Sequence, residues 1–295
     1  MRRDVFTGDT VRILGGAMSW RTCQKFDAHV HVLPDERAAQ FLADRGPDAP
    51  WSCCGVEDYL RRMDRYGIER ALLLPANDQY LYYQDPNETN RFLGELVKRH
   101  SDRFWAFADV TASGAYFIEQ TPWILETAVK EYGLSGLKIH PTNLHMDADD
   151  LCLVPVLRKA AELGVPVMFH ANPCRLGFHD NCAPDKINRM IQVFPDLDII
   201  TAHLGGMKWQ DAVSGCTWVD MSYILPRLVE LYGSEQTNRV LRAFGPDRLI
   251  FGTDFPDGEY DIYFDILDQM DFTEGEIDKI AWKNLGSLLS GGKTR

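Results

Sequence analysis

The feature that most constrains the fold is the alternation of short apolar runs, rich in β-branched residues, with longer segments of helical periodicity. The short runs predict strands, and their nearly continuous apolar character is typical of a parallel sheet buried on both faces. Eight strands are predicted, at Lys25–Val32, Glu69–Pro75, Phe104–Val110, Ser135–His140, Pro166–Ala171, Asp198–His203, Thr217–Ser222 and Arg248–Asp254.

Helical periodicity fills the intervals between these strands. Helices are predicted at Val56–Tyr66, Asn87–His100, Pro122–Tyr132, Leu151–Leu163, Ala183–Val193, Leu225–Leu231, Asn238–Ala243, Tyr260–Met270 and, as a C-terminal helix, Glu274–Leu289. Eight strands alternating with helices predict an α/β protein with the (β/α)8 TIM-barrel fold, in a single domain with long loops on its C-terminal rim. An open doubly wound sheet is the alternative, but no GxGxxG turn follows an early strand. We expect residues 1–22 to form an N-terminal extension and residues 23–290 to form the barrel.

Charge and hydropathy exclude several classes of protein. The 295 residues include 43 acidic and 31 basic side chains, for a formal net charge of −12, with no Lys/Arg cluster beyond short pairs. Nucleic acid is not an expected partner, because its phosphates require a basic surface. No apolar run reaches the roughly 18 residues of a membrane span, and Met1–Gly16 lacks the continuous apolar core of a signal peptide. We therefore expect a cytoplasmic protein that does not insert into a membrane.

Two predicted loops stand out by their length and aromatic content. Residues 33–55 follow the first strand and include Phe41 and Trp51, and residues 76–86 follow the second strand and include three tyrosines. In a barrel both loops lie on the C-terminal rim. They either cap the pocket with aromatic surface or pack onto neighbouring helices, and the sequence leaves both interpretations open.

Histidines give the first indication of chemistry. His29 and His31 alternate with Val30 on the first predicted strand, so their side chains face the same side, about 7 Å apart along the backbone. Two such imidazoles can chelate one metal ion, and they suit zinc, iron, nickel or copper better than magnesium. An HxH pair alone is weak evidence, since two histidines can share a strand without binding a metal.

The positions of the other polar residues strengthen the metal hypothesis. His140, His170 and His203 end the fourth, fifth and sixth predicted strands, and Asp254 ends the eighth. In a TIM barrel these strand ends converge at one mouth, where the catalytic residues of the fold lie. Any single histidine can be a buried, hydrogen-bonded core residue, but a cluster of this size at one mouth needs polar partners or a metal.

Six ordered motifs resemble those of the amidohydrolase superfamily, in particular the amidohydrolase-2 branch, which includes aminocarboxymuconate-semialdehyde decarboxylase and related hydrolases, lactonases and hydratases. The motifs are DAHVH, GLKIHP, FHAN, TAHLGG, WVDMS and FGTDFP, on predicted strands 1, 4, 5, 6, 7 and 8. The resemblance extends from Phe26 to Leu289 and includes the sequence WKNLGSLL in the last helix. Six motifs in order, at the spacing of a barrel, are far more specific than any one of them.

The resemblance implies a set of site residues. His29, His31, His170 and Asp254 would bind one divalent metal ion, with Zn²⁺ as the first expectation and Mn²⁺ as the alternative. His203 would contact water or substrate, and Asp254 would also transfer a proton, so these two are the candidate catalytic residues. The resemblance is also compatible with a homodimer, although the sequence shows no self-complementary patch.

Lys138 admits two roles. It has the same strand parity as His140, so both side chains are expected to face the barrel lumen unless the register slips by one residue. In binuclear relatives a lysine on the fourth strand is carboxylated and bridges two metals, whereas we favour an unmodified ammonium that holds a substrate carboxylate or an internal partner. Lys138 and His140, together with the basic side chain of Arg175 on the rim, are the candidate substrate-binding residues. Basic residues of this kind suit a carboxylate, so the expected substrate is a small acid.

The ligand set allows more than one reaction. Three neutral histidines and one carboxylate would leave a divalent ion with net positive charge and an open position, which lowers the pKa of bound water from about 15.7 towards about 7. The first hypothesis is hydrolysis of a small, carboxylate-bearing amide, lactone or ester. The alternative is a lyase that decarboxylates or hydrates an unsaturated or aromatic acid. A non-catalytic binding barrel is the third hypothesis, and the complete ligand set argues against it.

Overall fold

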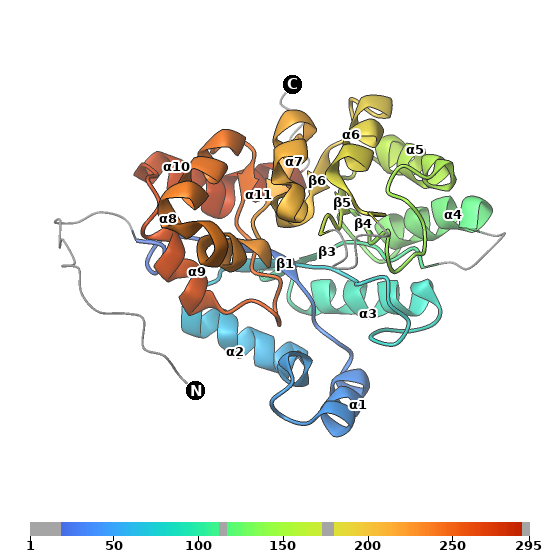
Figure 1. Cartoon of the computed structure of the whole chain (residues 1–295). Helices are drawn as coiled ribbons and strands as arrows, with labels where there is room; N and C mark the ends of the chain where they lie inside the picture. The colour runs from blue at the N-terminus through green and yellow to red at the C-terminus, as the bar shows by residue number, and fades with distance from the viewer. Residues whose placement is uncertain (1–18, 112–116, 173–179, 291–295) are drawn as a thin grey trace.

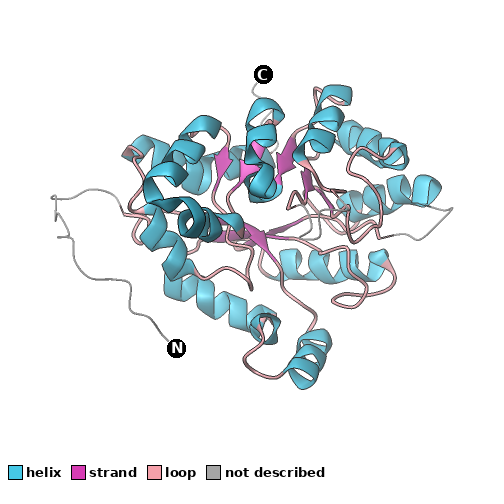
Figure 2. Cartoon of the chain, in the orientation of Figure 1, coloured by secondary structure: helices cyan, strands magenta, loops and turns pink. Residues whose placement is uncertain are grey.

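The computed structural model describes residues 19–111, 117–172 and 180–290. Within these ranges, short parallel strands form the centre of the molecule and helices surround them (Figure 1 and Figure 2). The strands are β1 (Phe26–Val30), β2 (Arg70–Leu73), β3 (Phe104–Ala106), β4 (Leu137–Ile139), β5 (Val167–Phe169), β6 (Ile199–Thr201), β7 (Trp218–Asp220) and β8 (Leu249–Ile250). The helices are α1 (Asp35–Arg45), α2 (Val56–Tyr66), α3 (Pro86–Arg99), α4 (Phe117–Lys130), α5 (Val154–Leu163), α6 (Pro184–Val193), α7 (Trp209–Gly215), α8 (Ile224–Phe244), α9 (Tyr260–Leu267), α10 (Glu274–Asp278) and α11 (Asn284–Leu289).

The strands close into a barrel. β1, β2 and β3 pair in parallel, and β4 to β8 form a second parallel series in chain order. On one side Lys138 N donates to Ala108 O at 3.1 Å, which joins the chain after β3 to β4. On the other side Asp254 N donates to His29 O at 2.9 Å, which joins the chain after β8 to β1. The predicted TIM-barrel fold is confirmed, because every pairing is parallel and follows the order of the chain.

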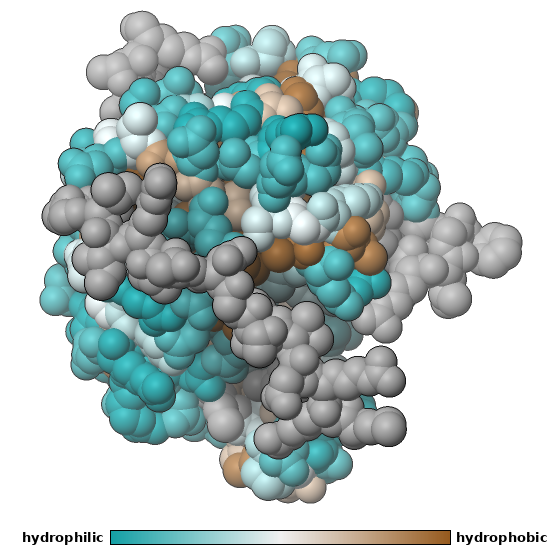
Figure 3. Space-filling model, turned by 60° about the vertical axis from the view of Figure 1, so that its left-hand side comes forward, coloured by the Kyte–Doolittle hydropathy of each residue, from teal (hydrophilic) through white to brown (hydrophobic). Residues whose placement is uncertain are grey.

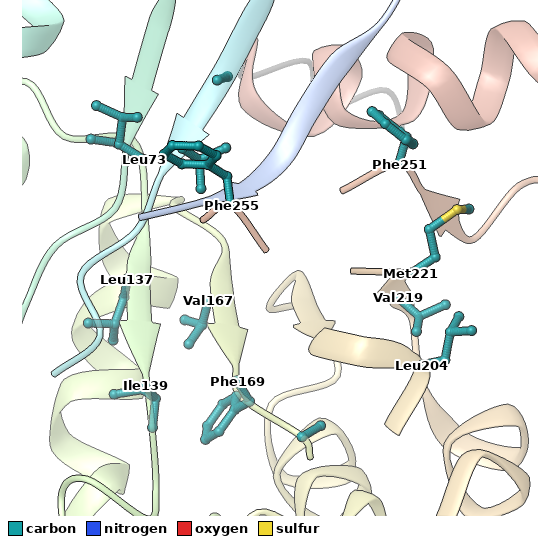
Figure 4. Close-up of a cluster of buried hydrophobic side chains, with 14 of the residues drawn as sticks. Leu73, Leu137, Ile139, Val167, Phe169, Leu204, Val219, Met221, Phe251 and Phe255 are labelled. Carbon is teal, nitrogen blue, oxygen red and sulfur yellow. The ribbon is translucent and has the colours of Figure 1, made fainter. Parts of the chain in front are cut away.

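The buried core has an inner and an outer layer, because successive strand residues point to opposite sides of the sheet. The inner layer includes Leu72, Phe107, Met168, Ile200 and Ile250. The outer layer, which includes Leu137, Ile139, Val167 and Phe169, is shown in Figure 4. Burial on both faces is the physical reason for the nearly continuous apolar runs in the sequence.

A register shift in β1 directs the first histidines into the site. The pairing of β1 with β2 shifts between Asp27 and Val30. Ala28 packs in the inner layer, whereas Val30, two residues later, packs in the outer layer. Strict alternation would put both on the same side, so the shift re-aims the end of the strand, as bulges near functional sites commonly do. His29 and His31 consequently lie with their ring nitrogens close to Asp254.

The paired part of each strand is shorter than predicted. β8 contains only two residues, although seven were predicted, and β6 contains three. Asp254 and His203 were predicted to end these strands, but they have φ values of 67° and 57°, which a strand cannot contain. The polar residues of the site therefore lie in the tight turns that follow the strands.

Three helices also differ from the prediction. The two helices predicted after the seventh strand form a single element, α8, interrupted at Gly233, where φ is 77°. α7 follows β6, where no helix was predicted, because seven residues are too few for a clear periodic pattern. α1 lies in the first long loop and has no buried residue, so it lacks the apolar stripe that indicates a helix. Figure 1 shows α1 at the edge of the molecule, apart from the strands.

The face of the molecule drawn in Figure 3 is mainly polar. On the face drawn in Figure 3, hydrophilic residues cover most of the area that is not grey, and apolar residues form smaller groups. Among the described residues, no helix combines the length and the hydropathy that crossing a membrane requires.

Candidate active site

Three of the predicted metal ligands meet where β1 pairs with the chain after β8. Asp254 Oδ1 lies 3.2 Å from His29 Nε2 and 3.3 Å from His31 Nε2. All three side chains are buried. Because Asp254 N donates to His29 O, the backbone pairing that closes the barrel also brings the carboxylate beside the two rings.

The hydrogen bond made by Nδ1 of each ring determines whether Nε2 can present a lone pair. His29 Nδ1 lies 3.0 Å from Asp220 Oδ2, and His31 Nδ1 lies 2.8 Å from Leu74 O. Both partners accept hydrogen bonds, so each Nδ1 carries a proton, and the neutral form of each ring presents a lone pair at Nε2. Two imidazoles and a carboxylate that face one another in a buried site can hold a cation between them. This donor set fits a divalent transition metal, for which imidazole and carboxylate are ordinary ligands.

Burial and neighbouring charges set the protonation of this group. Burial lowers the pKa of His29 to about 3, and the positive charge of Lys138 acts in the same direction. Burial alone would raise the pKa of Asp254, but the imidazoles of His29 and His203 outweigh it and hold that pKa well below its usual range. At neutral pH the group therefore consists of a neutral imidazole and a carboxylate, which are the forms that bind a metal.

Lys138 lies inside the barrel with its side chain fully buried. Its Nζ lies 3.1 Å from His29 Nε2 and 3.8 Å from Met168 Sδ. Burial lowers the pKa of Lys138 to about 8, against an opposing effect of Asp254 and Asp220. The lysine thus points into the lumen, and it contacts the same nitrogen of His29 that a metal would bind.

His170 and His203 form a hydrogen-bonded pair. His203 Nδ1 lies 3.1 Å from Ser222 O, which can only accept, so the proton of His203 is on Nδ1. His203 Nε2 then accepts from His170 Nδ1 at 2.9 Å, and His170 Nε2 is left with a lone pair. The structure places His170 beside His203 and not within the group of His29, His31 and Asp254.

His140 stacks on His170, with ring centroids 3.8 Å apart and planes 13° from parallel. Its Nδ1 accepts from Asn143 N at 3.3 Å, so the proton of His140 is on Nε2, which can donate to a bound acid. Asn77 Oδ1 accepts from His140 N at 2.7 Å and holds this residue in place. Arg175, the third predicted substrate-binding residue, lies outside the described residues.

Aromatic rings flank the histidines on two sides. Trp51, from the first long loop, stacks on His31 with ring centroids 5.5 Å apart and planes 29° from parallel. Tyr223 meets the ring of His203 edge-on, with centroids 5.9 Å apart. Of the two roles left open for the first loop, the structure favours the cap over the site, because Trp51 lies against a predicted ligand.

The second long loop packs against α1 instead. Tyr83 OH donates to Glu36 Oε1 at 2.6 Å, and Tyr80 OH donates to Asp44 Oδ2 at 3.2 Å. Both carboxylates belong to α1, which follows β1. The first long loop therefore caps the site, whereas the second packs onto a neighbouring helix.

Two site residues were not singled out from the sequence. Asp220 ends β7, and Ser222 follows it, within the WVDMS motif. They contact His29 and His203, the histidines at the centre of the cluster. The rule that identified His140, His170 and Asp254, a polar residue at the end of a predicted strand, applies equally to Asp220.

A closed parallel barrel with histidines and a carboxylate at the C-terminal ends of its strands belongs to the class of TIM barrels with a polar site in the mouth. Residues 26–284 match the model of the family described as Amidohydrolase. Because this match covers most of the chain, the protein belongs to the amidohydrolase family, as its motifs predicted. No curated protein matches the sequence significantly.

Solved structures with the same fold are similar over nearly the whole chain. A dihydroxybenzoic acid decarboxylase from Polaromonas, solved with manganese and 2-nitroresorcinol, is 20% identical, with a TM-score of 0.68 over 90% of this chain and 97% of that one. A TIM-barrel protein from Bordetella bronchiseptica is 19% identical, with a TM-score of 0.71 over 91% and 99%. A 5-carboxyvanillate decarboxylase from Novosphingobium aromaticivorans, also with manganese, is 14% identical, with a TM-score of 0.70 over 92% and 97%. At these identities the likeness establishes the fold alone.

Proposed function

We propose that this protein is a metal-dependent lyase that removes the carboxyl group of a small planar acid as CO₂, without an oxidant. The observation that carries the proposal is a group of candidate metal donors, His29, His31 and Asp254, with Trp51 stacked on His31 and Tyr223 edge-on against the neighbouring His203. Flat aromatic walls suit a planar, unsaturated substrate better than a saturated amide or lactone. Decarboxylases of aromatic acids among the similar structures support the same choice. The order of the two hypotheses from the sequence is thereby reversed.

The residues that would hold the metal are His29, His31 and Asp254, with the lone pair of His170 Nε2 available as a fourth donor. When bound, a divalent ion supplies positive charge that neutralises and orients the oxygens of an acidic substrate. Two of the similar structures contain manganese, which supports Mn²⁺ as a candidate. The nitrogen-rich donor set supports Zn²⁺.

The protein's own groups account for the proton that the reaction needs. Asp254 is ionised, so it can take a proton from a substrate hydroxyl and return it to the carbon that bears the carboxyl group. The bond from that carbon to the carboxyl carbon then breaks, its electron pair remains with the planar system, and CO₂ leaves. His140 Nε2 can donate a hydrogen bond to the substrate, and Trp51 excludes water from one side.

Hydrolysis is the second candidate, and one observation favours it. An ionised Asp254 beside a metal-binding group can equally accept a proton from water, as hydrolysis of an amide, ester or lactone requires. The same donors serve both reactions, so the choice between them depends on the products.

A product screen tests the proposal directly. Protein loaded with Mn²⁺ or with Zn²⁺ would be incubated with hydroxylated benzoic acids and, in parallel, with carboxylate-bearing amides and lactones. We expect metal-dependent release of CO₂ from at least one aromatic acid. Release of acid from an amide or lactone, with no CO₂ from any aromatic acid, would establish the hydrolase instead.

Substitution of Asp254 by asparagine tests its proposed role in proton transfer. Asp254→Asn keeps an oxygen for the metal but cannot take up a proton. Turnover should fall by a factor on the order of 10²–10⁴, the usual range for loss of general acid–base catalysis, while metal content stays substantial. Metal content by elemental analysis, measured on the same sample as turnover, separates a lost proton carrier from a lost ligand.

A further inference from the structure

Asp220 is completely buried, and both of its carboxylate oxygens form hydrogen bonds. Its Oδ2 accepts from His29 Nδ1 at 3.0 Å. Its Oδ1 accepts from His203 N at 3.1 Å, from Ser222 N at 2.9 Å and from Ser222 Oγ at 2.5 Å. None of these contacts requires a proton on the carboxyl group, so Asp220 acts as an acceptor at both oxygens.

The two oxygens of Asp220 have different tasks. Oδ1 receives three donors that hold the turn after β6 to the end of β7, where His203 has a φ of 57°. Among the described residues, Oδ2 is hydrogen-bonded only to His29. Since Oδ2 can only accept, it keeps the proton of His29 on Nδ1 and directs the lone pair of Nε2 into the site, where Lys138 Nζ lies 3.1 Å away.

Ser222 also fixes the proton positions of two further rings, those of His203 and His170. Its hydroxyl donates to Asp220 and lies 3.1 Å from His29 Nδ1 and 2.9 Å from His203 Nδ1, so it can accept from both rings. Its carbonyl accepts from His203 Nδ1, which makes His203 Nε2 the acceptor for His170 Nδ1. The lone pair on His170 Nε2 is the end of this chain of hydrogen bonds.

We propose that Asp220, with Ser222, is the positioning residue that sets the proton positions of His29, His203 and His170, so that His29 Nε2 and His170 Nε2 present lone pairs to a metal. The inference rests on the proposed metal-dependent function and deepens it. Asp220 does not touch the metal or the substrate; it acts through the rings that do. Partners of this kind fix the orientation and the tautomer of metal-binding histidines, and their loss commonly weakens metal binding by about 10–100-fold.

The first test uses the metal-free wild-type protein, labelled with ¹⁵N at histidine. Long-range ¹H–¹⁵N NMR distinguishes a proton on Nδ1 from a proton on Nε2. We expect His29, His170 and His203 to carry it on Nδ1, and His140, whose Nδ1 accepts from Asn143 N, to carry it on Nε2. Finding His29 in the Nε2–H form would overturn the proposal without any variant.

The second test is Asp220→Asn. Three donors converge on Oδ1, so the carbonyl oxygen of asparagine must take that place and its NH₂ group must face His29 Nδ1. An NH₂ group cannot accept, so the proton of His29 should move to Nε2, the atom that a metal would bind. We expect the affinity for Mn²⁺ or Zn²⁺ to fall by about 10–100-fold, with the Nε2–H form of His29 visible by NMR. Wild-type affinity together with His29 still in the Nδ1–H form would contradict the proposal.

The matched control is Ser222→Ala, which removes the shared hydroxyl but keeps Asp220 Oδ2 for His29 and the Ser222 backbone carbonyl for His203. His29 should remain in the Nδ1–H form, and metal affinity should fall less than in Asp220→Asn. If Ser222→Ala lost as much metal affinity as Asp220→Asn, the Ser222 hydroxyl would be the group that sets the ring protons, and the role proposed for the Asp220 carboxylate would be wrong. Tautomers and metal affinity are read without substrate, so failure of the decarboxylase assignment leaves these outcomes interpretable.

Discussion

At the scale of single residues, the interior of the barrel holds an ammonium group against an imidazole. Lys138 Nζ and His29 Nε2 are 3.1 Å apart in a region where both side chains are fully buried. Burial lowers the pKa of both groups, because each charged form loses its hydration. Lys138 therefore stands where it can stabilise negative charge in the site, at a cost to the stability of the fold.

That cost predicts the effect of Lys138→Met. The pKa of the lysine falls from 10.5 to about 8 on folding, which corresponds to about 3 kcal/mol of unfavourable free energy while the lysine is charged. Since the folded-state pKa is the lower one, wild-type stability rises with pH between about 8 and 10.5. Lys138→Met should therefore be more stable than wild type at pH 7, and the difference should shrink as the pH rises through this range.

Urea unfolding of both metal-free proteins at pH 7 and pH 10 measures this difference. A variant that is less stable than wild type at pH 7 would show that the ammonium stabilises the fold. In the loaded protein we expect Lys138→Met to keep metal content near wild type and to lose turnover of acidic substrates.

His170 is a predicted metal ligand that lies outside the group of His29, His31 and Asp254. Its Nδ1 is hydrogen-bonded to His203 and its ring is stacked on His140. We expect His170→Ala to lose most of the bound metal while it stays folded, because the apolar layers of the barrel do not include this residue. Elemental analysis and circular dichroism test both parts; full metal content would show that His29, His31 and Asp254 suffice.

At the scale of elements, the joint between β1 and the chain after β8 is built around Asp27. This buried carboxylate accepts from Thr253 N at 3.0 Å, from Tyr260 OH at 2.7 Å and from His29 N at 3.1 Å. It thereby links the backbone of one predicted ligand to the residue before another, Asp254. The hydrogen bonds of Asp27 therefore connect the closure of the barrel to the site.

Helix packing around the barrel has its own tight contact, at Gly94 of α3. A Cβ at this position would lie 2.7 Å from Tyr132 Cβ and 2.8 Å from Tyr132 O, just after α4. Gly94→Ala should therefore destabilise the protein by about 1–3 kcal/mol through overpacking, although alanine favours a helix. Gly275→Ala in α10, where nothing lies within 4 Å, is the control and should be neutral or stabilising by up to about 1 kcal/mol. Equal unfolding midpoints for the two variants would contradict the close approach of the helices.

At the scale of the whole molecule, we expect the fold to form without a metal. The inner and outer apolar layers run through the strands and the surrounding helices, and they exclude the site histidines. Metal-free protein should accordingly unfold in a single transition above room temperature. A barrel built this way tolerates an array of polar groups at one end.

Metal binding should still raise the unfolding temperature, because it favours the folded state by mass action. At a free metal concentration of 100 Kd the gain is about 2.7 kcal/mol. We expect Mn²⁺ or Zn²⁺ to increase the Tm measured by calorimetry and a chelator to reverse the increase. Asp254→Ala, which removes a donor, is the control and should show a smaller shift at equal concentration. An equal shift in both proteins would place the metal elsewhere.

The sequence by itself determined the barrel and the rim. Eight apolar runs alternate with helical periods, and this pattern is local, so it can be read without knowledge of the fold. The same order put polar residues such as His203 and Asp254 at strand ends, which a barrel brings to one mouth. The lengths of the strands were overestimated, because residues with a positive φ follow the paired segments directly.

Only the tertiary structure decided which nitrogen of each ring faces the site. The Nδ1 partner of His29 is Asp220, 191 positions further along the chain, and the Nδ1 partner of His31 is the carbonyl of Leu74, just after the neighbouring strand β2. The stacking of Trp51 on His31 likewise depends on how a long loop folds back. Periodicity records which side of a strand is buried, whereas a proton position depends on the partner across the ring, and that partner is brought there by barrel closure.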